Sequence, residues 1–381
     1  MIGAQRYERT PQRTNRRNGT RPKTVATTAG EVELAIPKLR TGSFFPSLLH
    51  PRRRVDKALY AVICSAWIEG VSTRKVDDLV KALGNESGIS RSTVSRICKD
   101  IDEGVHEFLA RRLDHTWFPY LFVDATYLDV RAGHRVVSRA LVVATGVSAQ
   151  GRREILGMAL GDAETTDFWT SFLRSLRERG LKVPSPHDPE GVVLVTSDAH
   201  AGIRAAVRAI LPGASWQRCR VHFARTITSR LGSARSKPVN ALVSTIFAQT
   251  TPEAVMAQYQ HVIDTLRDAF PEIAQMLKDA EPDLTAFAAF PREHWTKIWS
   301  NNPIERLNRE IKRRADVVQV FPDSDSARPL IGSVLLEQHE EWQYGERRYL
   351  SQTSLRHLTD MLHTDNTGGD GGRAALPPIT T

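Results

Sequence analysis

A continuous apolar stretch that contains a single carboxylate restricts the fold of this chain most. Residues 120–130 are rich in aromatic and β-branched side chains and follow Pro119, which is typical of a strand. The first four of these residues are apolar without alternation, which predicts a central strand with both faces covered. Asp124 stands inside the stretch, and a carboxylate there costs several kcal/mol unless it is paired or binds a metal. Asp129, at the polar end, is expected to be solvated.

Composition indicates a soluble protein with a polyanionic partner. The chain has 381 residues, and its Lys and Arg exceed its Asp and Glu by 52 − 43 = 9. It contains no apolar run long enough to span a membrane and no signal peptide, so the sequence predicts a cytoplasmic protein without a membrane partner. The three cysteines lack a CxxC spacing, and no GxxxxGK[ST] motif is present. These absences argue against a disulfide framework and against an ATP-dependent enzyme.

The N-terminal residues 1–50 are predicted to form a basic arm followed by a short strand. Seven Lys and Arg residues between Arg6 and Lys23 stand against one acid, Glu8, and apolar residues are too few for independent folding. Phosphate contact and a solvated, disordered terminus remain equal alternatives for this arm. Residues 31–39 alternate polar and apolar side chains and predict a strand, which Pro37 restricts to an edge position.

Residues 51–115 are predicted to form a helical DNA-binding region. Within it, residues 72–101 show a helix, a short turn containing glycine, and a second helix, as in a helix-turn-helix motif. The outward face of the second helix carries the candidate DNA-binding residues Arg91, Ser92, Thr93 and Arg96. The alternative is an ordinary helical hairpin whose polar face meets only water. The neighbouring basic arm favours DNA binding.

The following residues alternate strand and helix patterns. Three strands are expected at 120–130, 135–145 and 153–160, then a helix at 165–180, a strand at 191–198, a helix at 201–211 and a strand at 215–223. This order predicts an α/β fold with a ribonuclease H-like core whose first part is 116–223. The remaining chain is expected to divide into a helical insertion at 224–298, helices that complete the core at 299–363, and a disordered tail at 364–381.

Two further carboxylates are candidates to lie beside Asp124. Asp198 ends a short apolar strand, where ligand sites of open α/β sheets gather, although such an Asp also commonly caps the next helix. Glu305 lies in a helix that starts at Asn302-Pro303, but Asn302-x-x-Glu305 is also a capping-box spacing, and Glu310 is a rival acid. Basic residues of this helix predict phosphate contact, and they are Arg309, Lys312, Arg313 and Arg314.

Three such carboxylates suit two-metal phosphoryl transfer. Oxygen ligands favour two Mg²⁺ ions, with Mn²⁺ as a substitute, and no histidine base is then required. Cys219-Arg220-Val221-His222 could suggest zinc, but a structural zinc site needs four ligands and no second pair is present. Packing and hydrogen bonding beside the carboxylates is the preferred role for Cys219 and His222.

Seven stretches together resemble the Mutator-family transposases of bacterial insertion sequences. They lie in order along the chain, the resemblance covers roughly residues 6 to 355, and the stretches are IPKLRTGSFFPSLL, GVSTRKVDDLVKALG, GISRSTVSRIC, FVDATYLDVR, SDAHAGIRAAV, WQRCRVHFARTI and NNPIERLNREIKRR. The resemblance implies an Asp–Asp–Glu (DDE) triad of Asp124, Asp198 and Glu305, and so favours Glu305 over Glu310. It also implies that Cys219 and His222 are the family's Cys-x-x-His signature, and we expect Asn308 to support the same site.

The resemblance implies a transposase that acts on the terminal inverted repeats of its own element and on target DNA, as a homodimer or larger assembly. Family members usually carry a further helical segment before the stretch that matches 6–20, and here Met1 stands almost at its start, which predicts a shortened N-terminal region. Two alternatives remain: a DNA-binding regulator or inactive remnant, and a metal-dependent nuclease without strand transfer.

Overall fold

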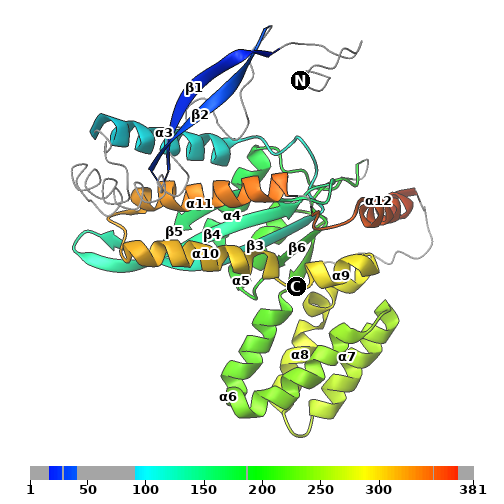
Figure 1. Ribbon diagram of the computed structural model, residues 1–381. Helices are drawn as coiled ribbons and strands as arrows, with labels where there is room; N and C mark the ends of the chain where they lie inside the picture. The colour runs from blue at the N-terminus through cyan, green and yellow to red at the C-terminus, as the bar shows by residue number, and fades with distance from the viewer. Residues whose placement is uncertain (1–16, 28–29, 41–90, 186–187, 346, 368–381) are drawn as a thin grey trace. The chain divides into compact units, whose positions relative to one another are not determined.

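The computed structural model describes residues 17–27, 30–40, 91–185, 188–345 and 347–367 (Figure 1). The chain divides into two compact units, 1–104 and 105–381. Residues 51–90 of the predicted helical DNA-binding region lie outside the described residues, so the helix-turn-helix motif stays a prediction. Within the described ranges, no helix combines the length and the apolar character that crossing a membrane requires.

The N-terminal unit contains a two-stranded antiparallel hairpin. Strand β1 (Arg17–Thr27) pairs with β2 (Gly30–Leu39), and Val25 lies opposite Val32. Residues 17–27, which the sequence assigns to the basic arm, therefore form a strand, and the alternative of a disordered terminus is wrong for them. The structure at these residues rests on the backbone pairing between β1 and β2.

Helix α3 (Arg91–Ala110) contains the residues that the sequence assigns to the outward face of the second helix of the DNA-binding region. Its backbone carries Arg91, Ser92, Thr93 and Arg96, whose side chains are not among the described ones. The DNA-binding role of these four residues stays a prediction.

The C-terminal unit is built on a five-stranded mixed sheet with the order β5-β4-β3-β6-β7 (Figure 1). The first three strands form an antiparallel meander, and the last two run parallel to β3. Their bounds are β3 (Tyr120–Ala132), β4 (Arg135–Val147), β5 (Arg153–Gly161), β6 (Leu194–Ser197) and β7 (Ser215–Arg218). The predicted α/β class is confirmed, and the sheet is compatible with a ribonuclease H-like core.

Helices cover both faces of the sheet. Alternate residues of β3 belong to two different cores, because side chains of a strand point to opposite faces in turn. Leu121 and Val123 pack with α4 (Thr166–Glu178) and α5 (Ala201–Ile210). On the other face, α10 (Asn302–Val318) contacts β3 and α11 (Ser324–Tyr344) contacts β5. The strand is therefore buried on both sides, as its continuous apolar run predicts.

A helical region follows the last strand. It contains α6 (Arg220–Ser244), α7 (Pro252–Leu266), α8 (Pro271–Leu284), α9 (Trp295–Ile298) and the 3₁₀ turns Thr245–Ala248, Ala286–Ala289 and Arg292–His294. The strand predicted at 215–223 is wrong beyond Arg218, because α6 begins at Arg220. The last helix is α12 (Gln352–Thr367).

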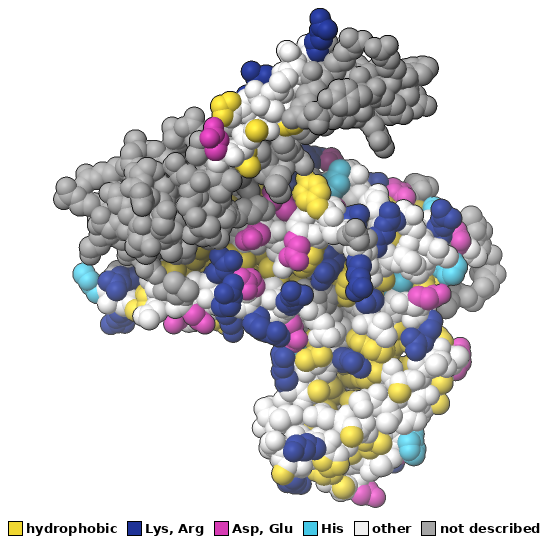
Figure 2. All heavy atoms as spheres, viewed as in Figure 1, with side chains coloured by type: hydrophobic (Ala, Val, Ile, Leu, Met, Phe, Trp, Pro, Cys, Tyr) yellow, Lys and Arg dark blue, Asp and Glu magenta, His cyan; other side chains and the backbone are white. Residues whose placement is uncertain are grey.

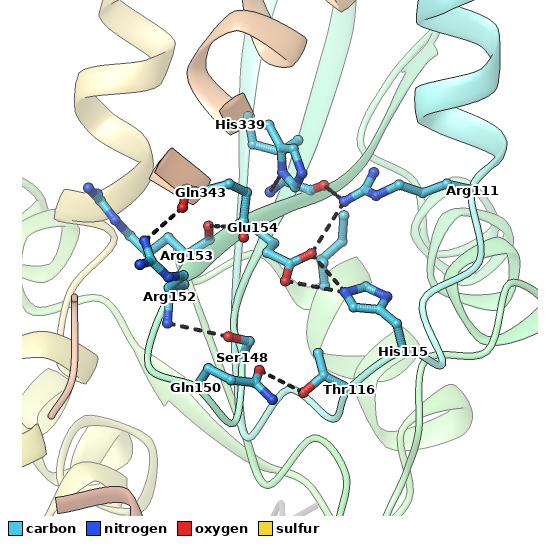
Figure 3. Close-up of polar contacts among 12 residues, drawn as sticks. Arg111, His115, Thr116, Ser148, Gln150, Arg152, Arg153, Glu154, His339 and Gln343 are labelled. Carbon is cyan, nitrogen blue, oxygen red and sulfur yellow. Dashed lines mark hydrogen bonds and ion pairs between the residues drawn. The ribbon is translucent and has the colours of Figure 1, made fainter. Parts of the chain in front are cut away.

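Polar contacts attach α11 to the edge strand β5 (Figure 3). Arg152 Nη1 donates 2.8 Å hydrogen bonds to the backbone oxygens of Gln343 and Gly345 at the end of the helix. Gln343 Nε2 donates back to the Arg153 oxygen, and the Ile155 amide donates to His339 Nδ1. The two Arg152 bonds satisfy carbonyls that a helix C-terminus leaves without partners.

Candidate active site

Asp124 lies in β3 on the face that α10 covers. Its side chain is 7% exposed, and Asn308 Nδ2 donates a 2.7 Å hydrogen bond to Asp124 Oδ2. Asn308 stands on α10, so this bond joins the central strand to the helix that carries Glu305. Asp129, further along β3, is exposed, as its polar surroundings predict.

Asp198 and Glu305 both act electrostatically on Asp124. Burial raises the pKa of Asp124 to about 7, repulsion from Asp198 adds to the rise, and Glu305 makes a smaller contribution. The parallel register pairs Phe122 with Thr196, and Asp124 and Asp198 each follow two residues later. Asp198 and Glu305 are thus near enough to Asp124 to raise the pKa of its carboxyl.

Glu305 lies in the first turn of α10 and is held by a cation. Arg225 Nη2 donates a 2.8 Å hydrogen bond to Glu305 Oε1. The helix is capped by the backbone of Asn301, whose side chain makes no capping hydrogen bond and donates to the Val123 oxygen instead. Glu310 pairs with Arg313 and Arg314 and does not join the aspartates.

Cys219 connects the segments that carry the second and third carboxylates. It is fully buried at the N-terminus of α6, and its amide donates a 2.7 Å hydrogen bond to the Ser197 oxygen, just before Asp198. Its Sγ accepts a 3.3 Å hydrogen bond from the Asn301 amide, just before α10. Burial raises the pKa of the Cys219 thiol, so the side chain stays neutral and acts as an acceptor.

His222 lies in the first turn of α6 and contacts Arg225, the arginine that holds Glu305. His222 Nε2 and Arg225 Nη1 are 3.2 Å apart. Burial lowers the pKa of His222, which favours the neutral ring that can accept a hydrogen bond from the guanidinium. The histidine therefore orients Arg225, and through it Glu305.

Replacing Cys219 by alanine should lower the free energy of unfolding by about 1–2 kcal/mol, because the buried Asn301 amide loses its acceptor. Cys219→Ser should lower it less, since the hydroxyl retains an acceptor. Urea unfolding of the two variants and the wild type checks this order. An alanine variant as stable as the wild type would contradict the role of the thiol.

The donor set suits a hard divalent cation. Within the part of the chain that the structure describes, no three His, Cys, Asp or Glu side chains already form a metal-binding group. Yet the site offers carboxylate oxygens, and Oδ1 of Asn301 and of Asn308 are buried there without a hydrogen-bond partner among the described residues. Oxygen ligands of this kind favour Mg²⁺, and a cation would relieve the repulsion that raises the pKa of Asp124.

The predicted basic residues of α10 fall into two groups. Arg309 and Lys312 are exposed, as phosphate contacts require. Arg313 and Arg314 are engaged by Glu310. The DNA-binding role of all four residues stays a prediction.

Arg225 and Asn301 were not identified from the sequence. Arg225 follows His222 by three residues, which brings both side chains to one face of a helix. That signal was hidden because residues 220–223 were interpreted as a strand. Asn301 contacts Val123 and Cys219, which are far away in sequence, so no local pattern indicates its role.

The family described as "Transposase, Mutator family" matches residues 1–345 of this chain. The transposase for insertion sequence element IS1081 of Mycobacterium tuberculosis is 45% identical over 386 aligned positions, covering 100% of this chain and 90% of the relative. The transposase for IS256 in transposon Tn4001 of Staphylococcus aureus is 36% identical, covering 92% and 88%. The transposase for IS406 of Burkholderia multivorans is also 36% identical, covering 91% and 87%.

Proposed function

The chain belongs to the Mutator family of transposases, and we propose that it cuts and joins DNA at the terminal inverted repeats of its own insertion sequence. The observation that supports this chemistry best is that Asp124 and Asp198 follow paired positions of neighbouring parallel strands, and that Asp198 and Glu305 both raise the pKa of the buried Asp124. We also propose that the sheet is a ribonuclease H-like core, because a three-stranded antiparallel meander continued by two parallel strands has that order.

In this proposal, Asp124, Asp198 and Glu305 are the DDE triad and hold two Mg²⁺ ions, with Mn²⁺ as a substitute. The bound ions would lower the pKa of the attacking hydroxyl and neutralise charge on the phosphate. Asn308 fixes the orientation of the Asp124 carboxylate through its amide. Arg225 forms an ion pair with Glu305. When DNA binds, the Arg225 guanidinium can release this carboxylate and contact a DNA phosphate instead.

The proposed reaction has two steps at the same carboxylates. Water first attacks a phosphorus atom, the bond to the 3′ oxygen breaks, and a 3′-hydroxyl and a 5′-phosphate are released. The 3′-hydroxyl then attacks a phosphodiester of target DNA, and the new bond replaces the one broken there. Only the nucleophile differs, so the same side chains serve both steps.

The proposed partners are DNA and further copies of the chain. The exposed Arg309 and Lys312 on α10 suit backbone phosphates. Two element ends must be joined in one event, so we propose a homodimer or larger assembly on DNA, in the cytoplasm.

A cleavage and strand-transfer assay tests the proposal. The purified chain is incubated with Mg²⁺ and labelled duplexes that carry the inverted repeats flanking its gene. We expect a new 3′-end at the repeat and joined products with target DNA. Binding without cleavage would favour a DNA-binding regulator, and cleavage without joined products would favour a nuclease.

A further inference from the structure

A basic pocket lies beside the N-terminal turns of α10. Its volume is about 520 Å³, within the roughly 300–1,000 Å³ of ordinary ligand sites. Asn302, Arg306 and Leu307 of α10 line it, and so do Lys297 and residues that follow α11. Arg306 is adjacent in sequence to Glu305, so the pocket and Glu305 share the first turns of α10.

Positive charge dominates the lining of this pocket. The cationic residues are Arg153, Lys297, Arg306, Arg347 and Arg348. Glu341 is the one acid among the described lining residues, and it accepts a 2.6 Å hydrogen bond from Gln338. Figure 2 shows Lys and Arg side chains in dark blue along α10 and around its N-terminal end. Such an excess of positive charge favours an anionic ligand.

Arg153 is the clearest sign of an anion-binding site. Its guanidinium carbon lies 4.2 Å from the ring centroid of Trp342 and 5.1 Å from that of Tyr349. Burial lowers the pKa of Arg153, and repulsion from Arg306 lowers it further. No carboxylate of the described residues forms an ion pair with Arg153. An anion placed between Arg153 and Arg306 would relieve this repulsion and replace lost hydration.

The pocket is built on a framework of hydrogen bonds. Tyr349 Oη donates a 2.8 Å bond to the Lys297 oxygen, and the Tyr349 amide donates a 2.8 Å bond to the Gly151 oxygen. Gln343 Nε2 fixes the backbone of Arg153 (Figure 3). The stacked guanidinium is thus held in place before a ligand arrives, which reduces the entropy lost on binding.

We propose that this pocket binds a backbone phosphate of the DNA strand that runs to the carboxylates. The phosphate oxygens lie between the guanidinium groups of Arg153 and Arg306, with Arg348 and Lys297 around them. Guanidinium groups suit this ligand because they contact phosphate oxygens through paired N–H donors. This proposal rests on the proposed function. It adds a DNA contact that lies outside the triad and outside the basic residues of α10 at positions 309–314.

The salt dependence of DNA binding measures this contact. Each phosphate contact contributes about 0.9 to the slope of log K against log salt for duplex DNA, and about 0.7 for a single strand. Arg306→Gln and Arg153→Gln should each reduce the slope by roughly that amount and weaken binding about three- to tenfold at 0.1 M salt. The probe is a fluorescein-labelled duplex that carries the element's inverted repeat, bound to the full chain without Mg²⁺.

The matched control is Arg174→Gln, because Arg174 is exposed on α4, on the opposite face of the sheet. It should leave the slope unchanged. A slope equal to that of the wild type in both pocket variants would overturn the proposed site, as would a wild type that binds no DNA. A reduced slope in a protein whose wild type binds but never cleaves would support the pocket and reject the proposed chemistry. The Arg306 side chain is exposed, so Arg306→Gln should not affect folding. A reduced slope in this variant therefore reports loss of the phosphate contact, even if Arg153→Gln also disturbs folding.

Discussion

Asp124→Asn should reduce strand cleavage by roughly a thousandfold or more while making the metal-free protein more stable at pH 8. Cleavage falls because the buried carboxylate is the central ligand of the proposed triad. Stability rises because asparagine removes a charge that burial and Asp198 disfavour, yet its side-chain oxygen still accepts from Asn308. Cleavage of labelled inverted-repeat duplexes and urea unfolding in chelator are the two measurements.

The pH dependence of stability gives the sign of this effect. The pKa of Asp124 rises from 3.8 to about 7 on folding, so the folded chain holds this proton more strongly than the unfolded chain. Asp124 therefore makes stability fall as pH rises from about 4 to about 7, with little change above that window. The shift sets an upper limit of about 4 kcal/mol, and we expect a gain on the order of 1–4 kcal/mol for the asparagine variant at pH 8.

Asp129→Asn is the matched control, because Asp129 is exposed on the same strand. It should leave cleavage unchanged and should lack the gain in stability expected of Asp124→Asn at pH 8. Wild-type cleavage by Asp124→Asn would reject the triad. If Asp124→Asn were less stable than the wild type at pH 8, Asp124 would not be held in an unfavourable ionised state.

The sheet was predictable because the residue pattern of each strand indicates a strand without reference to distant residues. The unbroken apolar start of β3 identifies a strand covered on both faces, and the polar position of Asp129 identifies its exposed end. The error at 220–223 has a physical cause. Cys219, Val221 and Phe223 alternate with polar residues as in a strand, but Cys219 and Phe223 also have the spacing of one helix face. Both are buried, and the packing of α6 decides between the two patterns.

The candidate site was predictable in part. Asp124 and Asp198 stand out because each interrupts or ends an apolar run. Glu305 was chosen over Glu310 only by resemblance, since a capping box explains the same spacing. Arg225 contacts Glu305 across 80 residues of sequence, and such pairs are set by tertiary structure rather than by local pattern.

The largest expected loss of stability comes from Gly151→Ala, in the turn between β4 and β5. Gly151 has φ of 77°, a backbone conformation that costs other residues about 1–2 kcal/mol. A Cβ atom there would also lie 2.1 Å from the backbone oxygen of Leu350, which cannot move alone because the Leu350 and Tyr349 amides both donate to the Gly151 oxygen. We expect a loss of roughly 3 kcal/mol or more in urea unfolding.

Gly133→Ala separates the two causes, because Gly133 has φ of 61° and nothing within 4 Å of its added Cβ atom. It should lose only the conformational part, about 1–2 kcal/mol. Equal losses in the two variants would show that the close approach to Leu350 has no cost. Because the Gly151 turn also positions Tyr349 in the basic pocket, Gly151→Ala should reduce the salt slope of DNA binding under conditions where it stays folded, whereas Gly133→Ala should not. The turn would then be required both for the stability of the sheet and for the proposed phosphate contact.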